Sequence, residues 1–465
     1  MQDDLHIEPF IHLVDVTHDA ALVAWGGFHF RRDRVRDRWD IVDDQDLQES
    51  CGRHTCIGHA AESFGPTVVE VLDAGRGRVL SRAHSDATWT WVRDLEPDTD
   101  YRYRVLVDGR EWAAGERWDW VEDRRGGYDL APAGLSYDLR FRTWPEPHAE
   151  TPPLRFIALG DYGVGIRSDS ESSRRQRRIA EVLDRFVADH DVRFVVSLGD
   201  NIYQGEQGAV DDESGGEDDD WYSSFFQPYR YALARVPFFP AIGNHDTTDT
   251  EGADDRAQME DNFHLAERFR SPGRDCIEPG LFYRVRYGRD LELVCIDSSQ
   301  DPEEGVHRHF QAGDQLEWLR EVFSAPDVRW RIPFSHHPVY CAGPSHDDDS
   351  EMLETLDPLF ATADVRLVLA GHEHNFQIGR VDRRTYVVSG AGGQVRDEAP
   401  ARLGEKGVEA WAAHAHLLVV DVDGDRARLT PVSGLLGDGS PHLMTALDAQ
   451  NKVVRPPYDV DAASD

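Results

Sequence analysis

A chain of 465 residues is too long to bury one hydrophobic core, so two domains are expected. The formal net charge of −37 at pH 7 repels DNA, RNA and anionic lipid, which argues against a nucleic-acid-binding function. No run of about 18 apolar residues occurs, which excludes a membrane-spanning helix.

The start of the chain, MQDDLHIEPF, lacks the basic segment and the apolar stretch of a secretory leader. We therefore expect a cytoplasmic protein; the alternative is a secreted or periplasmic form whose leader is missing from this numbering. Five cysteines in a chain of this length do not indicate a disulfide framework. Cys51 and Cys56, in CGRHTCIGH, match no common zinc spacing, so a local disulfide or two free thiols is expected.

Residues 1–148 show the pattern of an all-β domain. Short strand-like runs such as TVVEVL and YRYRVLV are separated by turns that contain Gly, Asp or Pro. The segment Leu95–Val105, followed by Phe141–Pro145, resembles the closing strands of a fibronectin type III sandwich. In that family a tyrosine near the start of such a strand ties down the preceding turn, and Tyr101 stands at the matching position. The proline-rich linker Pro145–Pro153 marks the domain boundary.

Residues 149–434 change to an α/β pattern, in which apolar runs alternate with amphipathic segments. In Arg174–Asp189 the apolar residues recur at spacings of three and four, which predicts a helix, and Gln315–Phe323 repeats the pattern. The acidic stretch 205–220 lacks EF-hand spacing and is interpreted as a solvated loop. Residues 435–465 have little periodicity, which predicts an extended or frayed C-terminal tail.

Five polar clusters each follow directly on a short apolar run. They are GDYG from Gly160, GDNIY from Gly199, GNHD from Gly243, SHHP from Ser335 and GHEH from Gly371. Ligands bind an open α/β sheet in the crevice outside the carboxyl ends of its strands, so the clusters are expected to meet there. A single Gly-Asp is more often an ordinary turn, and His336-His337 alone could be a packed pair. The five together, in this order, leave little room for a purely structural interpretation.

The order and spelling of these clusters resemble the metallophosphoesterase superfamily and, within it, the tartrate-resistant and other purple acid phosphatases. Tyr203 of the second cluster is the discriminating residue, and VPFFPAIGNHD, QLEWL, GHEHNFQ and VVSGAGG add to the likeness. The resemblance covers roughly residues 154–431. It implies an α/β fold, a four-layer αββα sandwich, which here follows the fibronectin type III-like domain.

The resemblance also implies two adjacent metal ions. Two carboxylates and a phenolate form a hard, anionic set that suits Fe(III), whereas imidazoles with an amide oxygen suit divalent Fe, Zn or Mn. A phenolate bound to Fe(III) absorbs visible light, which would make the protein purple. The first ion would be held by Asp161, Asp200, Tyr203 and His374; Asp200 would bridge to the second, which is completed by Asn244, His336 and His372.

Such a pair of ions lowers the pKa of bound water, and the resulting hydroxide would attack phosphorus in line. The resemblance implies that the activity is hydrolysis of small phosphate monoesters. His245 would face the substrate as a proton donor or transition-state stabiliser, with Asp246 as its orienting partner. His346, ten residues beyond His336, is a second general-acid candidate.

Two other functions stay open at this point. A phosphodiesterase or nucleotide hydrolase would use the same two-metal core, and Tyr203 argues against it only by resemblance. A binding protein with an inactive phosphatase-like domain is disfavoured, because every expected ligand is present. Neither a nucleic acid nor a membrane is expected as a partner, and the sequence does not indicate an oligomeric state. His307 and His309, in GVHRHF, are interpreted as solvated, and His337 as the neighbour of the ligand His336.

Overall fold

The computed structural model describes residues 5–35, 37–42, 66–122, 128–203, 221–246, 255–269, 281–300, 314–325, 328–404 and 407–462. Cys51, Cys56, the acidic stretch 205–220, His307 and His309 lie outside these ranges, so what the sequence predicts for them stays a prediction. None of the helices in the described ranges is long and apolar enough to cross a membrane.

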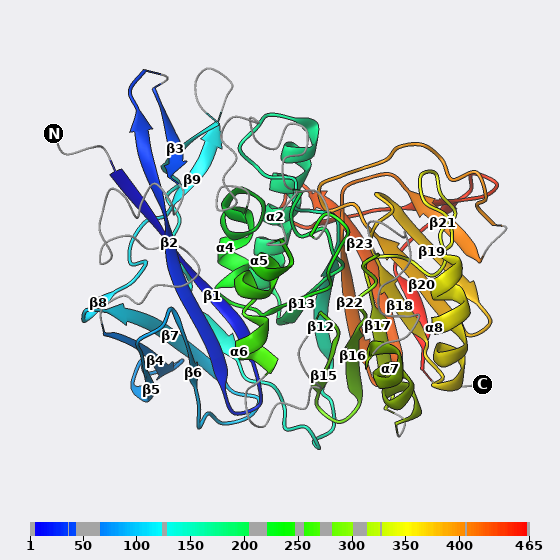
Figure 1. Ribbon diagram of the computed structural model, residues 1–465, viewed down its shortest axis with the longest axis horizontal. Helices are drawn as coiled ribbons and strands as arrows, with labels where there is room; N and C mark the ends of the chain where they lie inside the picture. Colours follow the sequence, from blue (N-terminus) through cyan, green and yellow to red (C-terminus); the bar gives the residue numbers. More distant parts are fainter. Residues whose placement is uncertain are drawn as a thin grey trace.

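The N-terminal part of the chain is built from antiparallel strands, as the sequence predicts (Figure 1). Its two main sheets share an apolar core, in which Val23 and Trp25 of one sheet lie buried with Val71 and Val105 of the other. The first sheet contains β1 (Leu5–Val16), β2 (Ala21–Asp33), β3 (Arg38–Val42) and β6 (Trp89–Val92). The second contains β4 (Thr67–Asp73), β5 (Val79–Ser85), β7 (Asp100–Val107), β8 (Arg110–Glu111) and β11 (Arg140–Arg142). A separate pair is formed by β9 (Trp118–Glu122) and β10 (Tyr128–Pro132).

Tyr101, at the start of β7, ties down the turn before it, as its position in the sequence indicates. The backbone N–H of Glu96 donates to the Tyr101 hydroxyl at 2.8 Å. The Thr143 hydroxyl, just beyond β11, donates to the Glu96 carbonyl at 2.7 Å. The turn between β6 and β7 is therefore fixed from two neighbouring strands, which satisfies backbone groups that a loop would otherwise leave to water.

The second part of the chain has four layers: helices, two mixed sheets, and helices again (Figure 1). The predicted four-layer fold is confirmed. The seven-stranded sheet contains β12 (Leu154–Leu159), β13 (Val192–Ser197), β14 (Phe238–Pro240), β22 (Leu417–Asp423), β23 (Arg426–Leu435), β24 (Pro441–Leu443) and β27 (Tyr458–Asp461). The nine-stranded sheet contains β15 (Tyr283–Tyr287), β16 (Leu291–Cys295), β17 (Trp330–Phe334), β18 (Leu367–Ala370), β19 (Phe376–Val381), β20 (Arg384–Ser389), β21 (Val408–Ala412), β25 (Ala446–Asp448) and β26 (Val453–Val454).

The helical layers cover the outer faces of these sheets. The layer toward the N-terminal domain contains α2 (Glu171–Asp189), η1 (Tyr222–Phe226), α4 (Gln227–Leu233), α5 (Asp255–Asn262) and α6 (Leu265–Phe269). The opposite layer contains α7 (Asp314–Ser324) and α8 (Ser350–Thr362). Both helices that the apolar spacing predicts are present as α2 and α7. In α2 the predicted face is buried, with Ile179, Leu183 and Phe186 at 5% exposure or less.

The sequence predicts an extended or frayed tail beyond Leu435; the chain there is extended but not frayed, because it forms short paired strands. β24 and β27 pair with β23, while β25 and β26 extend the nine-stranded sheet. Met444, Ala446 and Val460 are buried by this pairing. Each of these strands is only two to four residues long, so no period-2 pattern can emerge in the sequence. The edges of the two sheets supply the partners that local sequence does not reveal.

The two parts of the chain share one continuous apolar core. The ring of Phe226 in η1 lies 4.5 Å from that of Phe10 in β1. Trp144, just before the linker, packs on Phe194 and Tyr287 at centroid distances of 5.7 Å and 5.2 Å. Aromatic rings bury about 150–250 Å² each, so separating the two parts would expose a large apolar surface.

A buried ion pair crosses the same interface. The guanidinium of Arg230 in α4 lies 2.7 Å from the Glu8 carboxylate in β1 and 3.2 Å from Asp119 in β9. The side chains of Arg230 and Glu8 are only 2% and 3% exposed. Two charges removed from water in this way must stay paired, so the pair fixes the position of the N-terminal domain on the helices.

Candidate metal centre

The loops that follow five strands meet at one edge of the two sheets. Asp161, Asp200 and Asn244 follow β12, β13 and β14, which run parallel to one another. His336 and His372 follow β17 and β18, which are parallel neighbours in the other sheet. Parallel strands present their carboxyl ends at the same edge, so the clusters predicted from sequence converge there from both sheets.

The backbone turns sharply where these strands end. Asp161, Asp200 and His372 have φ angles of 56°, 49° and 69°, in the left-handed region that side chains usually avoid. Gly199 and Gly371 provide the room for the loops to meet. A Cβ on Gly199 would lie 2.5 Å from His336 Nδ1, and one on Gly371 would lie 2.6 Å from Asp161 Oδ2.

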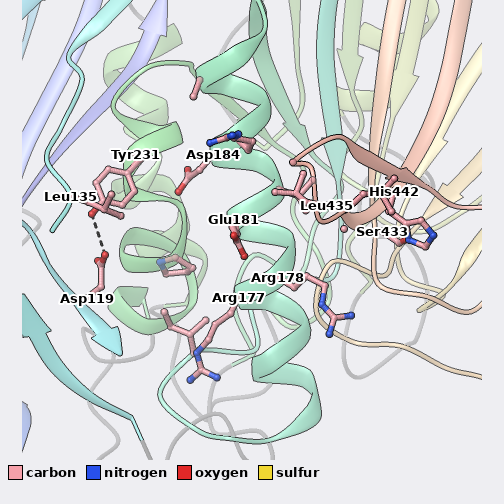
Figure 2. Close-up of a pocket in the computed structure, with 18 of the residues that line it drawn as sticks. Asp119, Leu135, Arg177, Arg178, Glu181, Asp184, Tyr231, Ser433, Leu435 and His442 are labelled. Atoms are coloured by element: carbon pink, nitrogen blue, oxygen red, sulfur yellow. Dashed lines mark hydrogen bonds between the residues drawn. The ribbon is translucent and has the colours of Figure 1, made fainter. Parts of the chain in front are cut away.

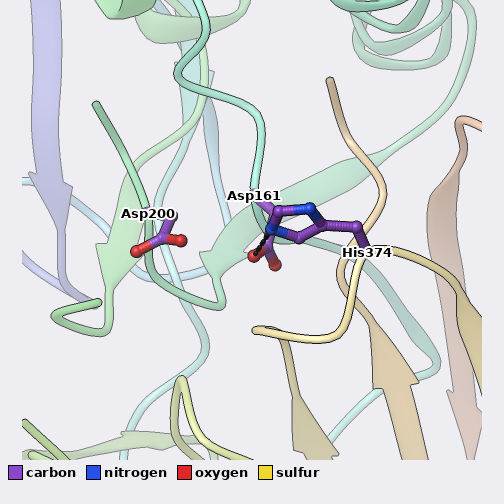
Figure 3. Close-up of side chains that lie close together, drawn as sticks. All are labelled: Asp161, Asp200 and His374. Atoms are coloured by element: carbon purple, nitrogen blue, oxygen red, sulfur yellow. Dashed lines mark ion pairs between the residues drawn. The ribbon is translucent and has the colours of Figure 1, made fainter. Parts of the chain in front are cut away.

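Three of the residues expected to bind the first ion lie in contact. The Tyr203 hydroxyl is 3.4 Å from Asp161 Oδ1 and 3.2 Å from His374 Nε2. His374 Nε2 is in turn 3.3 Å from Asp161 Oδ1. Figure 3 shows the His374 ring directed at Asp161, with the Asp200 carboxylate across from them. Ligand atoms of Asp161, Asp200 and His374 all lie within 4.8 Å of one another, close enough for one cation to contact all three.

Asn244, His336 and His372 form a second group beside the first. Asn244 Oδ1 is 2.9 Å from His336 Nε2 and 3.1 Å from His372 Nδ1, and the two ring nitrogens are 3.1 Å apart. Asp200 Oδ1 lies 3.3 Å from His336 Nε2, so the Asp200 carboxylate reaches both groups. The structure therefore brings together every residue that the sequence predicts as a metal ligand, in two sets that share Asp200.

The partners of His336 show that this arrangement fits a cation. The Leu198 carbonyl, 2.9 Å from His336 Nδ1, can only accept a hydrogen bond, so Nδ1 carries the proton of the neutral ring. The lone pair of Nε2 then faces the oxygens of Asn244 and Asp200, an arrangement that a cation between them would stabilise. Asp200 Oδ2 is also buried, with no hydrogen-bond partner in the described part of the chain. A bound metal ion satisfies both features.

Burial shifts the pKa values of these groups toward their neutral forms. It raises the pKa of Asp161, and burial together with the charge of Asp161 raises the pKa of Asp200. Burial lowers the pKa of His336 and His372, and their histidine neighbours lower it further. Ligand atoms that burial has stripped of water are stabilised most by a bound cation. The cation replaces the lost solvation and displaces any proton bound to the carboxylates.

Asp246 does not orient the His245 ring as predicted. Its Oδ2 accepts from the Gly243 N–H at 2.7 Å and from Asn201 Nδ2 at 2.9 Å. Its Oδ1 accepts from the N–H groups of Asn201 and Ile202 at 3.0 Å and 3.3 Å. Both oxygens are thus occupied by the loops after β13 and β14, because these loops leave inward-facing amides that need an acceptor. The role of Asp246 is corrected to that of a brace between two ligand-bearing loops.

The rings of His245 and His346 each lie beside one of the two groups of predicted metal ligands. The His245 backbone N–H donates to Asp200 Oδ1 at 3.1 Å, and its ring centroid is 4.4 Å from that of Tyr203. The His346 ring lies 3.7 Å from that of His372, and burial together with the Arg396 charge lowers the His346 pKa to about 4. Both imidazoles therefore stand next to predicted ligands.

His337 lies near the same group, at a centroid distance of 4.3 Å from His372, and shares a 3.0 Å hydrogen bond with the Ser298 hydroxyl. Together with Asn244 and His346, His337 and His372 line a cavity of about 350 Å³. A larger cavity of about 1260 Å³ lies along α2, between the N-terminal domain and the turn from β23 to β24 (Figure 2). It contains none of the predicted ligands, so cavity size does not mark this site.

Sequence reasoning missed the buried polar residues that hold the ligand loops in place. Asn201, inside the GDNIY cluster, binds Asp246 and accepts from the Tyr162 hydroxyl at 2.6 Å. Glu373 and Asn375, inside and after the GHEH cluster, are wholly buried. The sequence signal that could have identified these residues is that they are polar, are not ligands, and stand in otherwise apolar surroundings. Such residues need a partner when they are buried.

The fold and the site define a class: proteins with two mixed sheets between helical layers and, at one edge of the sheets, side chains that could hold two metal ions. The calcineurin-like phosphoesterase family matches residues 154–376. The tartrate-resistant acid phosphatase type 5 of Mus musculus is 30% identical over 259 residues, which cover 52% of this chain and 74% of that protein. The chain belongs to the calcineurin-like phosphoesterase family, in which it is homologous to the tartrate-resistant and purple acid phosphatases. Membership implies a dinuclear metal centre and a phosphoesterase activity.

Two solved structures share the fold over nearly the whole chain. PhoD aligns with a TM-score of 0.59 at 12% identity, over 96% of this chain and 91% of its own. The purple acid phosphatase PPD1 of yellow lupin (Lupinus luteus) aligns with a TM-score of 0.56 at 14% identity, over 99% of this chain and 74% of its own. The strand-rich N-terminal part is therefore included in the structural similarity, whereas the mouse enzyme matches about half of the chain.

Proposed function

We propose that this protein hydrolyses small phosphate monoesters at a centre of Fe(III) and a divalent Fe, Zn or Mn ion. The proposal is supported chiefly by the two donor sets that share Asp200, whose second oxygen has no hydrogen-bond partner in the described ranges. Donor chemistry divides the sites: the phenolate set suits Fe(III) and the imidazole set suits the divalent ion. The Fe(III) ligands would be Asp161, Asp200, Tyr203 and His374; the divalent ion would take Asp200, Asn244, His336 and His372.

When bound, the two ions supply a water of lowered pKa and positive charge for the phosphoryl oxygens. The chain supplies hydrogen bonds and protons. The His245 ring, beside Tyr203, would donate to the phosphoryl group, and the His346 ring would protonate the departing alcohol oxygen.

The identity of the metal centre is tested by the visible spectrum and the metal content of the purified protein. We expect a broad visible band with about two metal ions per chain, and loss of the band in Tyr203→Phe. Tyr103→Phe is the matched control, because Tyr103 is also buried but donates to the Ala234 carbonyl far from the ligands. A colourless wild type that holds two Mn or Zn ions would contradict the Fe(III)–tyrosinate assignment and retain the hydrolase.

The substrate class is tested by turnover of 4-nitrophenyl phosphate against bis(4-nitrophenyl) phosphate, since both release the same chromophore. The monoester should be the better substrate, because two cations neutralise a phosphoryl dianion more effectively than a monoanion. Faster cleavage of the diester would make phosphodiesterase the correct function. His245→Ala should slow the monoester reaction while the two ions are retained, since the His245 ring is not among the proposed ligands.

A further inference from the structure

A row of buried polar side chains accompanies the metal ligands of the GHEH cluster. Glu373 stands between His372 and His374, and Asn375 and Gln377 follow at intervals of two residues. Their exposed fractions are 0%, 0% and 1%. Burial of three polar side chains beside a ligand turn is costly unless each has a partner, so their contacts indicate what the turn supports.

All three side chains bind the backbone of one loop, residues 342–346. Gln377 Oε1 accepts from the Ala342 N–H at 2.9 Å, and Gln377 Nε2 donates to the Gly343 carbonyl at 2.9 Å. Asn375 Nδ2 also points at the Gly343 carbonyl, at 3.4 Å. Glu373 Oε2 accepts from the N–H groups of Ser345 and His346 at 3.2 Å and 2.8 Å. The loop that carries His346 is thus held by side chains of the ligand turn.

Of these three side chains, Glu373 is the one that binds the backbone of His346 itself. The bond from the His346 N–H fixes the backbone from which the ring extends, and the ring lies 3.7 Å from that of His372. The same short segment therefore provides metal ligands on both sides of Glu373 and sets the position of the second histidine of the site. A displacement of this backbone would move the His346 ring relative to the metal centre.

Only a carboxylate satisfies every donor around Glu373. Oε2 faces the two backbone N–H groups, while Oε1 accepts from Asn375 Nδ2 at 3.4 Å and from Arg396 Nη1 at 3.3 Å. A glutamine has one acceptor oxygen. The charged Arg396 donor holds that oxygen more strongly than neutral amides do, so the NH2 group would face the N–H groups of Ser345 and His346, which would lose their acceptor.

We propose that Glu373 is a positioning residue that holds His346 where it protonates the leaving group, an inference that rests on the proposed phosphomonoesterase function. In that step the bond between phosphorus and the alcohol oxygen breaks, and that oxygen takes the proton from the imidazole. Water supplies the oxygen that bonds to phosphorus and later returns a proton to the ring. Glu373 acts through the loop backbone and touches no substrate.

The kinetic test compares wild type, Glu373→Gln, His346→Ala and the double variant on two substrates at constant pH. Phenyl phosphate has a poor leaving group that needs the proton, whereas 4-nitrophenyl phosphate has a good one. We expect kcat on phenyl phosphate to fall about 100-fold in His346→Ala and about tenfold in Glu373→Gln. On 4-nitrophenyl phosphate each loss should be under about threefold. In the His346→Ala background, Glu373→Gln should add nothing, since both remove the same interaction.

The controls separate positioning from metal binding. Glu373→Asp keeps two acceptor oxygens and should retain more activity on phenyl phosphate than Glu373→Gln. Glu70→Gln removes a carboxylate of similar burial in the N-terminal domain, bound by Arg82 and Arg104, and should leave both rates unchanged. Additive losses, equal losses on both substrates, or loss of the metal ions in both Glu373 variants would each overturn the proposal.

A measurement independent of activity is hydrogen exchange of peptides that contain Ser345 and His346, followed by mass spectrometry. In the wild type these amides should exchange slowly, and Glu373→Gln should speed their exchange at least about tenfold, which a lost hydrogen bond of about 1.4 kcal/mol produces. Fast exchange already in the wild type would refute the role of Glu373. Protected amides in a protein that cleaves neither ester would instead overturn the proposed function.

Discussion

The substitution Asp246→Asn tests whether Asp246 braces two ligand-bearing loops or orients the His245 ring. It changes the shape of the side chain very little. The carboxylate oxygens of Asp246 serve donors in two loops, one after β13 and one after β14. Asn keeps one oxygen and replaces the other by an NH2 group. If the retained oxygen faces Asn201 and Ile202, the new NH2 group faces the Gly243 N–H and the Asn201 amide, which are donors themselves.

The magnitude follows from counting donors that lose their acceptor. In either orientation of the introduced amide, two buried donors are left without an acceptor, because each oxygen of Asp246 serves two. A buried unsatisfied polar group costs about 1–3 kcal/mol, so Asp246→Asn should destabilise the protein by about 2–6 kcal/mol. The affected loops carry Asp200 and Asn244, so weaker retention of the metal ions should accompany the lower stability.

Urea unfolding of the metal-loaded protein measures this cost, with metal content determined on the same samples. His245→Ala is the matched control, because it removes the neighbouring ring without touching the brace; it should lower activity and leave the urea midpoint near that of wild type. The reasoning is refuted if Asp246→Asn unfolds at the wild-type midpoint, keeps both ions and loses kcat to the same extent as His245→Ala. That result would restore Asp246 as the partner of His245.

Other parts of the structure give further expected outcomes. Arg230→Met removes the nearer of two guanidinium groups from the buried Glu8 carboxylate and leaves Arg117 at 3.6 Å, so calorimetry should show a loss of at most about 3–5 kcal/mol, and the added change Glu8→Gln should recover part of it. A chain that lacks residues 1–148 exposes Phe226 and should aggregate; a monomeric and fully active fragment would contradict the shared core. Burial lowers the His416 pKa from 6.5 to about 4, so the folded state binds fewer protons than the unfolded state between these values. The stability that this group provides is therefore complete above pH 6.5 and falls by about 3 kcal/mol as the pH drops to 4, and His416→Gln should flatten the melting temperature across this range. A chelator that strips the ions should lower the melting temperature, since the desolvated donors around Asp200 then repel one another.

The sequence was informative where chemistry requires particular residue types at the ends of strands. Asp161, Asp200 and His372 could be placed at one edge because each follows a buried apolar run, and all predicted ligands lie together in the structure. The apolar face of α2 was predictable from a short-range pattern, whereas the role of Tyr101 was predicted from the resemblance to fibronectin type III strands. In these cases the residues nearest in sequence determine the outcome.

The failures share a different physical origin, which is contact between segments far apart in sequence. Asp246 stands next to His245 in the chain, yet its partners include amides of the loop after β13, 44 and 45 residues earlier. The short strands after Leu435 are stabilised by sheet edges that local sequence does not describe. In the sequence, Glu373 only separates two predicted ligands. Its contacts become evident once the loop that carries His346 packs against it.

The aromatic face of η1 also has a diagnostic use across the family. Tyr222 and Phe226 are buried and meet β1 and β2 through Phe10, Phe28 and Phe30. In a relative that lacks the strand-rich domain, we expect these two positions to face water and to carry polar side chains. The residues between the polar clusters GDNIY and GNHD therefore indicate whether a related chain carries the strand-rich domain, even when only part of its sequence is known.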